Sequence, residues 1–194
     1  MEYIILQGDA KPSNYWVADY IEISEAWEAV SKEMRGEISG LITPYGMDLE
    51  ISIDLETNGK LHLSVKKHLE NTKSGSALDV KPWPFSQVLE AKIRPLNSLK
   101  KSNILLERNK ISNRLLSFFK GFKKGTILDG FILYSDNLEA QNLTGIKELI
   151  QFEGFGKLSV DKSGFLVKFY SLPIGEKGNF ELIQLIKKLN KNIC

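Results

Sequence analysis

The two histidines of the chain, His62 and His68, are the first residues whose chemistry has to be considered. They lie in a segment where apolar and polar residues alternate, so both occupy the same face of one predicted strand. An extended strand separates them by about 20 Å, which no single metal ion spans. His62 beside Asp54, or His68 beside Asp48, supplies only part of a ligand set. We therefore predict solvated pairs between neighbouring strands and no metal site.

Carboxylates in the same segment suggest acid and base catalysis of the glycosidase type, with Asp54 and Glu56 or Glu50 and Asp54 as the pairs. Such a site needs one acid in an apolar pocket, where it stays protonated. Here all the carboxylates are predicted on a polar face opposite bases. No serine lies in a nucleophile elbow motif that would complete a triad with either histidine. We predict no catalytic residue.

The sequence also contains no motif that we recognise as a cofactor-binding site. Gly154-Phe155-Gly156-Lys157 leads into a predicted strand and lacks the spacing of a phosphate-binding loop. The single cysteine, Cys194, excludes an internal disulfide and a cysteine-rich zinc site. We predict no cofactor.

The segment 98–124 is strongly basic and is the best candidate for binding a partner. Apolar residues from Ile104 to Phe122 recur at helical spacing, which predicts an amphipathic helix. Such a helix can bind a protein groove, an anionic membrane surface or nucleic acid phosphates. Alternatively, its polar face is solvated or packs on the acidic N-terminal part. The candidate contacts are Arg108, Arg114, Lys120, Lys123 and Lys124.

A second binding candidate is Trp83, which lies in the rigid sequence Pro82-Trp83-Pro84-Phe85. An exposed tryptophan on a rigid loop is a good binding anchor, whereas a buried one would fill a junction between lobes. The surrounding residues 71–84 are rich in turn formers, which predicts a long loop or a boundary between two lobes.

Charge is distributed unevenly along the chain. Residues 1–56 hold 12 acidic and three basic residues, and residues 57–194 hold 12 acidic and 23 basic residues. Two interpretations stay open: the two parts pack together and neutralise each other, or one of them binds a charged partner. Hydrophobic residues at 42% and charged residues at 26% are typical of a globular protein. With no apolar run of membrane-spanning length and no signal-peptide pattern, we expect a cytoplasmic location.

The clearest structural pattern is the alternation of apolar and polar residues over 47–68, interrupted by Thr57-Asn58-Gly59. It predicts a hairpin with a three-residue loop and Gly59 in the left-handed conformation, which pairs Leu55 with Leu61. The polar face then carries opposite charges, with Glu56 opposite Lys60, Asp54 opposite His62, Glu50 opposite Lys66 and Asp48 opposite His68.

Other elements follow from similar patterns. We expect a buried strand at 3–6, a helix that begins with Ser24 as its cap and ends at Gly36 and Gly40, and a central strand at 130–134. A capping box at Asp136 and Glu139 predicts a helix to about Phe152. A second hairpin is expected over 157–170 and a final amphipathic helix over 180–190.

The stretch 115–170 contains Phe118-Phe119-Lys120, then Phe131-Ile132-Leu133-Tyr134-Ser135-Asp136-Asn137-Leu138-Glu139-Ala140, and then the hairpin of 157–170. In this order it resembles part of a bacterial domain family of unknown function. The resemblance implies a strand, a helix and a hairpin, and it implies no activity and no site residues. Many members of that family resemble membrane-anchored proteins with spans ahead of the domain.

Hairpins interspersed with helices predict an α+β fold, with antiparallel sheets built from hairpins and flanked by amphipathic helices. We expect one domain over 1–194, or two packed lobes with a boundary near 71–84. The expected function is non-catalytic binding of another protein, as an accessory protein or an inhibitor of the immunity type. In the latter case the acidic N-terminal region offers an alternative surface for a basic target. Nucleic acid or anionic lipid is the alternative partner, and an enzyme with a site assembled from unrecognised loops is a further alternative.

Overall fold

The computed structural model describes residues 3–7, 11, 15–55, 59–69, 85–94, 103–110, 125–135, 140–161, 164–173 and 175–193. Within these ranges the elements along the chain are β1 (Tyr3–Leu6), α1 (Tyr15–Glu33), β2 (Glu37–Thr43), β3 (Gly46–Leu55), β4 (Gly59–Leu69), β5 (Phe85–Arg94), β6 (Ile104–Arg108), β7 (Gly125–Leu128), β8 (Phe131–Ser135), α3 (Ala140–Gln151), β9 (Phe155–Asp161), β10 (Gly164–Phe169) and α4 (Gly175–Ile193).

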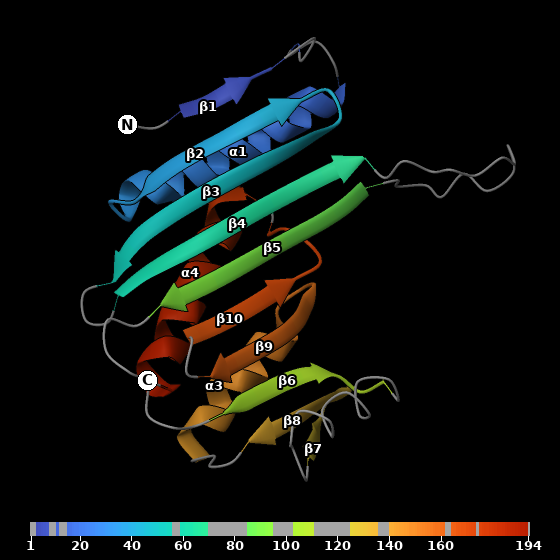
Figure 1. Ribbon diagram of the computed structural model, residues 1–194, viewed down its shortest axis with the longest axis vertical. Helices are drawn as coiled ribbons and strands as arrows, with labels where there is room; N and C mark the ends of the chain where they lie inside the picture. The colour runs from blue at the N-terminus through green and yellow to red at the C-terminus, as the bar shows by residue number, and fades with distance from the viewer. Residues whose placement is uncertain are drawn as a thin grey trace, which may run out of the picture.

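All of these strands belong to one ten-stranded sheet with the order β1-β2-β3-β4-β5-β10-β9-β6-β8-β7 (Figure 1). Neighbouring strands run antiparallel except β1 and β2, which are parallel and are connected through α1. The hairpin of β9 and β10 lies between strands that precede it in the sequence. The predicted α+β fold is confirmed. The predicted lobe boundary at 71–84 lies outside the described residues, and the sheet continues from β4 to β5 across it.

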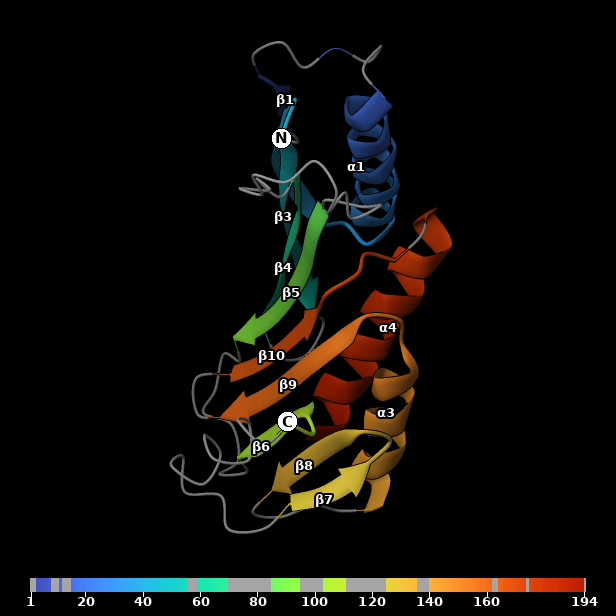
Figure 2. The same cartoon turned by 90° about the vertical axis from the view of Figure 1, so that its right-hand side faces the viewer.

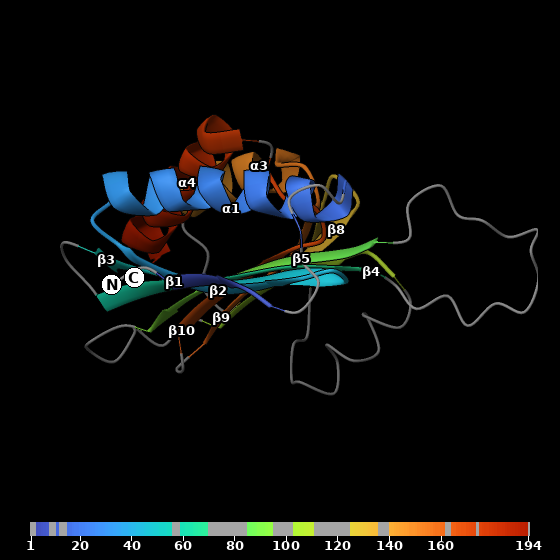
Figure 3. The same cartoon turned by 90° about the horizontal axis from the view of Figure 1, so that it is seen from above.

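The helices of the described chain all pack on one face of the sheet (Figures 2 and 3). Helix α1 covers β2 and β3, and α4 contacts both α1 and α3. The main core therefore lies between this helical layer and the sheet, and its largest fully buried side chains include Trp27, Tyr20, Phe165 and Phe169. None of the helices in the described ranges is both long and apolar enough to cross a membrane.

The alternating pattern of β3 and β4 places their apolar residues as predicted. Ile51, Ile53, Leu61 and Leu63 are buried on the helical face, and the polar residues between them face the other side. The predicted pairing is wrong by two residues, because Leu55 pairs with Gly59 and Ile53 with Leu61. A shift of two positions keeps each side chain on its face, so the apolar pattern alone does not fix the register. Gly59 has the predicted positive φ, of 112°.

The first helix differs from the prediction. It begins at Tyr15, nine residues before the predicted cap, and ends at Glu33. Ser24 is buried inside the helix, and its hydroxyl donates to the carbonyl of Ile21 at 2.8 Å. Gly36 follows the end of the helix, whereas Gly40 lies within β2.

Four strands were not predicted from the sequence. Residues of β2, β5 and β7 were assigned to no strand, and β6 lies inside the segment 98–122 for which a helix was expected. That helix prediction is wrong over Ile104–Arg108, because these residues pair with β8 and β9. The residues 111–124 lie outside the described part of the chain.

Later elements agree better. The helix to about Phe152, the hairpin over 157–170 and the final helix are confirmed as α3, β9 with β10, and α4. The strand over 130–134 is buried on both faces as expected, although it lies next to the edge strand β7. The strand at 3–6 exists, but it forms the other edge, where Ile5 and Leu6 are exposed.

Candidate functional site

Of the partner-binding candidates predicted from the sequence, only Arg108 lies within the described residues. Arg108 is exposed at the end of β6. The other five candidates lie outside the described residues, namely Arg114, Lys120, Lys123, Lys124 and Trp83. The binding of nucleic acid or anionic lipid by the segment 98–124 therefore stays a prediction.

The two histidines lie on the sheet face opposite the helices and take part in short polar contacts. His68 Nε2 lies 3.2 Å from Asp48 Oδ1, but the two residues are not opposite each other as predicted, because Asp48 pairs with Lys66 and His68 with Gly46. His62 instead contacts Ser52, with 2.9 Å between Nδ1 and Oγ, because the register differs from the predicted one. The contact of His62 and Ser52 is exposed. Both contacts join β3 to β4. The predicted opposition of Asp54 to His62 and of Glu50 to Lys66 is wrong, because Asp54 pairs with Lys60 and Glu50 with Ser64.

Oppositely charged residues continue across this face on β5 and β10. Glu90 lies 3.1 Å from the ammonium groups of both Lys92 and Lys168. Burial alone would raise the pKa of Glu90, but the hydrogen bonds and positive charges of the two lysines outweigh it and lower the pKa below the usual value of 4.5. Glu90 is therefore held in its charged form, and this face is a network of ion pairs.

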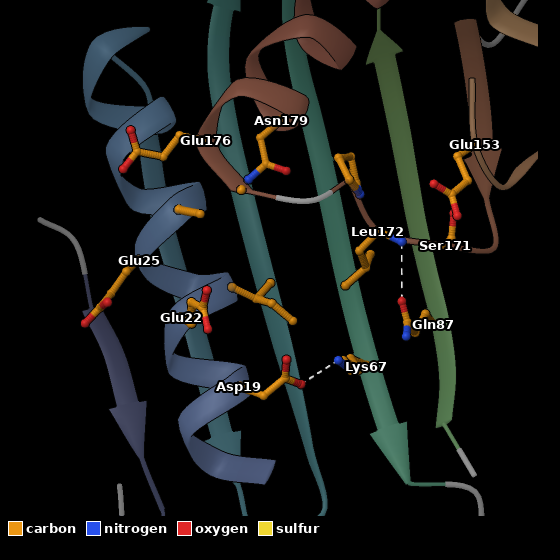
Figure 4. Close-up of a pocket in the computed structure, with 14 residues that line it drawn as sticks. Asp19, Glu22, Glu25, Lys67, Gln87, Glu153, Ser171, Leu172, Glu176 and Asn179 are labelled. Carbon is orange, nitrogen blue, oxygen red and sulfur yellow. Dashed lines mark hydrogen bonds and ion pairs between the residues drawn. The ribbon is translucent and has the colours of Figure 1, made fainter. Parts of the chain in front are cut away.

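A different cluster lies on the helical side of the sheet, in a cavity of about 720 Å³ between α1, the start of α4, the end of β4 and the start of β5 (Figure 4). We call it the acidic pocket. Its charged lining residues are Asp19, Glu22, Glu25, Lys67, Glu153 and Glu176. They come from four separate segments of the chain, and nothing in the spacing of these residues reveals that they meet.

Helical periodicity explains the wall that α1 forms. Asp19 and Glu22 are three residues apart and therefore lie on one stripe of the helix. That stripe is adjacent to the buried side of α1, which holds Val17, Tyr20 and Trp27. The carboxylates thus lie at the rim of the core, where the helix meets the sheet.

Lys67 enters the pocket from the sheet because it continues the inward-facing series Leu61, Leu63 and Val65 of β4. Its side chain is 11% exposed and its ammonium lies 2.5 Å from the carboxylate of Asp19. The ammonium also lies 6.0 Å from the ring centre of Tyr20. Burial, together with the charge of Asp19, raises the pKa of Tyr20 to about 12. Tyr20 is thus neutral at physiological pH.

The other carboxylates of the acidic pocket have no such partner. Glu22, Glu25, Glu153 and Glu176 are exposed, and they make no ion pair or hydrogen bond with the described residues. The described lining holds five carboxylates and one ammonium group, which is a formal charge of −4. Such a concentration of one charge attracts cationic groups.

Asn179 adds an unusual feature to this pocket. The residue is 1% exposed, and its side-chain oxygen Oδ1 has no hydrogen-bond partner among the described residues. Its amide points from the start of α4 into the pocket (Figure 4). Buried polar atoms are nearly always hydrogen-bonded to protein or to ordered water, so this acceptor is open to a donor from outside the chain.

Part of the pocket wall is apolar and fixed to the sheet. Ile23, Leu172 and Pro173 line it between the polar groups. The backbone N–H of Leu172 donates to Oε1 of Gln87 on β5 at 3.4 Å, which attaches the segment after β10 to the sheet. The wall is therefore built on α1, β5 and the connection to α4.

The carboxylates of the pocket are spread over several elements. Across the described ranges, no three His, Cys, Asp or Glu side chains are grouped closely enough to hold a metal ion. The arrangement suits a larger cation with several donors. The uneven charge of the sequence indicated an acidic surface near the N-terminus, but it did not indicate Lys67, Glu153, Glu176 or Asn179.

Comparisons of this chain with protein-family models, with curated proteins and with solved structures find no match. The resemblance of residues 115–170 to a bacterial family of unknown function stays a prediction.

Proposed function

We propose that this chain is a non-catalytic module that binds another protein, and that its acidic pocket receives a basic segment of that partner. The observation that carries the proposal is the set of four exposed carboxylates, Glu22, Glu25, Glu153 and Glu176, that line one cavity and form no ion pair with any residue in the described part of the chain. An accessory protein or an inhibitor of the immunity type would use such a surface to cover a basic region of its target.

Electrostatics supports binding over catalysis at this place. Like charges that converge on one cavity repel each other, and a cationic partner relieves that repulsion. The charges also steer the encounter, so the association rate depends on salt. On the opposite face of the sheet the carboxylates Asp48, Glu50 and Glu90 already have partners within the chain. That face therefore has less to gain from a cationic partner.

The test is affinity capture from the native host, followed by direct binding measurements with the captured partner. The double variant Glu22→Lys/Glu25→Lys reverses two charges of the pocket. A matched control, Glu33→Lys/Glu181→Lys, reverses two charges on exposed helical positions outside it.

We expect the pocket variant to bind the partner at least about tenfold more weakly than the wild type, mainly through slower association at low salt. The control variant should bind like the wild type. If the pocket variant keeps the same partner with unchanged Kd, the proposal is wrong. Thermal unfolding of both variants shows that the fold is retained.

A further inference from the structure

The charged groups that line the acidic pocket are mostly hydrogen-bond acceptors, beside the donors of Gln87, Ser171 and the Asn179 amide nitrogen. Carboxylates accept only, and the one ammonium group in the described lining, Lys67, already donates to Asp19. The oxygen of Asn179 adds a neutral acceptor at a buried point of the same cavity. A ligand that satisfies the pocket must therefore carry several donors on one end.

The elements around Asn179 place these acceptors on different sides. Glu176 lies three residues before Asn179 on α4 and therefore shares its side of that helix. Glu22 belongs to α1, across the cavity (Figure 4). A cation whose N–H donors point in different directions within one plane matches such an arrangement better than a cation whose donors all lie on one nitrogen.

The apolar residues of the pocket further restrict which cation it can bind. Ile23, Leu172 and Pro173 are all partly buried and line the cavity between the acceptors. A flat, weakly hydrated cation packs on such surfaces, whereas a compact ammonium ion keeps its water. The N-terminal end of α4 carries a partial positive charge of about half a unit, which Glu176 in the first turn and the remaining carboxylates outweigh.

We infer that the acidic pocket recognises an arginine side chain of the partner protein, with its guanidinium donating to Asn179 Oδ1 and to the carboxylates of Glu22 and Glu176. Guanidinium is the planar cation with five donors, and it forms paired hydrogen bonds with carboxylates. The inference rests on the proposed function and adds a specificity to it: arginine is preferred over lysine. Asn179 is the residue that makes this distinction, because its buried oxygen needs a donor that reaches past the carboxylates.

Two labelled peptides of equal charge test the inference, Gly-Ser-Arg-Ser-Arg-Ser-Gly and its counterpart with lysine at both basic positions. Fluorescence anisotropy at low salt measures their Kd values for the full chain. We expect the arginine peptide to bind at least about tenfold more tightly, which corresponds to about 1.4 kcal/mol. In Asn179→Leu the preference should fall below about threefold, while the lysine peptide binds as before. Glu22→Gln should weaken both peptides, and the control Glu33→Gln neither.

Because Asn179 is buried, Asn179→Leu can also disturb the fold, and two further measurements keep the test decisive. Asn179→Asp retains an acceptor at this position and should keep the preference for arginine. In the wild type, the side-chain amide signals of Asn179 should shift on titration with the arginine peptide and stay in place with the lysine peptide.

The outcomes separate this inference from the proposed function. Equal binding of the two peptides, weakened alike by Glu22→Gln, overturns the preference for arginine and leaves a protein-binding pocket. If neither peptide binds, the arginine inference is wrong, and the capture experiment alone decides the proposed function. If N-acetyl-arginine amide binds as tightly as the arginine peptide, the occupant is a free small molecule and the inference is also wrong.

Discussion

The ammonium of Lys67 lies 2.5 Å from the carboxylate of Asp19, and this ion pair joins the inward face of β4 to α1. The two ends of the pair are not equally buried, because the lysine side chain is 11% exposed and the aspartate side chain 37%. Water can therefore reach Asp19 more easily than Lys67. The loss of one partner should cost more when the lysine is the residue left behind.

We expect Asp19→Asn to lower the free energy of unfolding by about 2 kcal/mol, since it leaves a largely buried ammonium without its counter-ion. Lys67→Met retains the hydrocarbon stem and should cost about 1 kcal/mol, because Asp19 is then hydrated. The double variant should be more stable than Asp19→Asn alone. Urea denaturation of the three variants measures these differences. Equal losses in both single variants would contradict the asymmetry.

The position of Ser24 inside α1 leads to a prediction that separates the structure from the sequence pattern. A serine at the N-cap of a helix loses about 1 kcal/mol when replaced by alanine. Ser24 donates instead to the carbonyl of Ile21 within the helix, and alanine has the higher helix propensity. Ser24→Ala should therefore change the free energy of unfolding by less than about 0.5 kcal/mol. If chemical denaturation instead shows that Ser24→Ala lowers the free energy of unfolding by about 1 kcal/mol, the helix begins at Ser24.

Glu90 makes stability depend on pH in the acidic range. Its pKa in the folded protein is lower than the usual 4.5, owing to Lys168 and Lys92, so the stabilisation is present above that value and is lost as the pH falls below it. We expect Glu90→Gln to destabilise the protein by about 1 kcal/mol at pH 7 and by less at pH 3. Urea denaturation at the two pH values measures the effect.

A second variant in the same network provides the check. Lys168→Met removes one of the two ammonium groups, so the pKa of Glu90 should rise towards its usual value and the dependence on pH should shrink. If Glu90→Gln is equally destabilising at both pH values, the ion pairs are not the cause.

Gly46, at the start of β3, is a position where no side chain fits. A Cβ there would overlap the ring of His68 and lie 2.9 Å from the backbone oxygen of Lys67. We expect Gly46→Ala to cost about 1–3 kcal/mol, as overpacking does elsewhere, and to displace His68 from Asp48. Thermal unfolding measures the loss. The double variant Gly46→Ala/His68→Ala should recover part of it, because the ring is removed and only the contact with the backbone is left.

The faces of the strands were predictable from the sequence, whereas their pairing was not. In β3 and β4 the strict alternation assigns Ile53 and Leu61 to the core, and the structure confirms this. The choice between a partner at Leu61 and one two residues away depends on the turn after Leu55, which the alternation does not encode. The same limit explains why His62 contacts Ser52 and not Asp54.

Helix and strand periodicities failed where tertiary contacts decide the conformation. Ile104–Arg108 fits an apolar helical spacing, yet it pairs with β8 and β9. A short segment with apolar residues satisfies both patterns, and its neighbours in the sheet determine the outcome. In α1, the residues before Ser24 include several aromatic and branched side chains, which gave no clear helical signal.

The acidic pocket shows the largest gap between sequence and structure. The excess of acidic residues in the first 56 positions indicated a charged surface, and Asp19, Glu22 and Glu25 belong to it. Lys67 was detectable in principle, because it continues the apolar series of β4 with a charged residue. The burial of Asn179 depends on how α4 packs, which no local pattern reveals.

The strand order also determines the course of folding. Segments β2, β3 and β4 are consecutive hairpins, and their contacts are local, so they form quickly. The middle of the sheet is different, since β5 must find β10 far along the chain before either is covered on both sides. Closing such a long loop is slow. We therefore expect refolding to produce an early N-terminal meander, and the docking of β10 with α4 to limit the rate at which the native state appears.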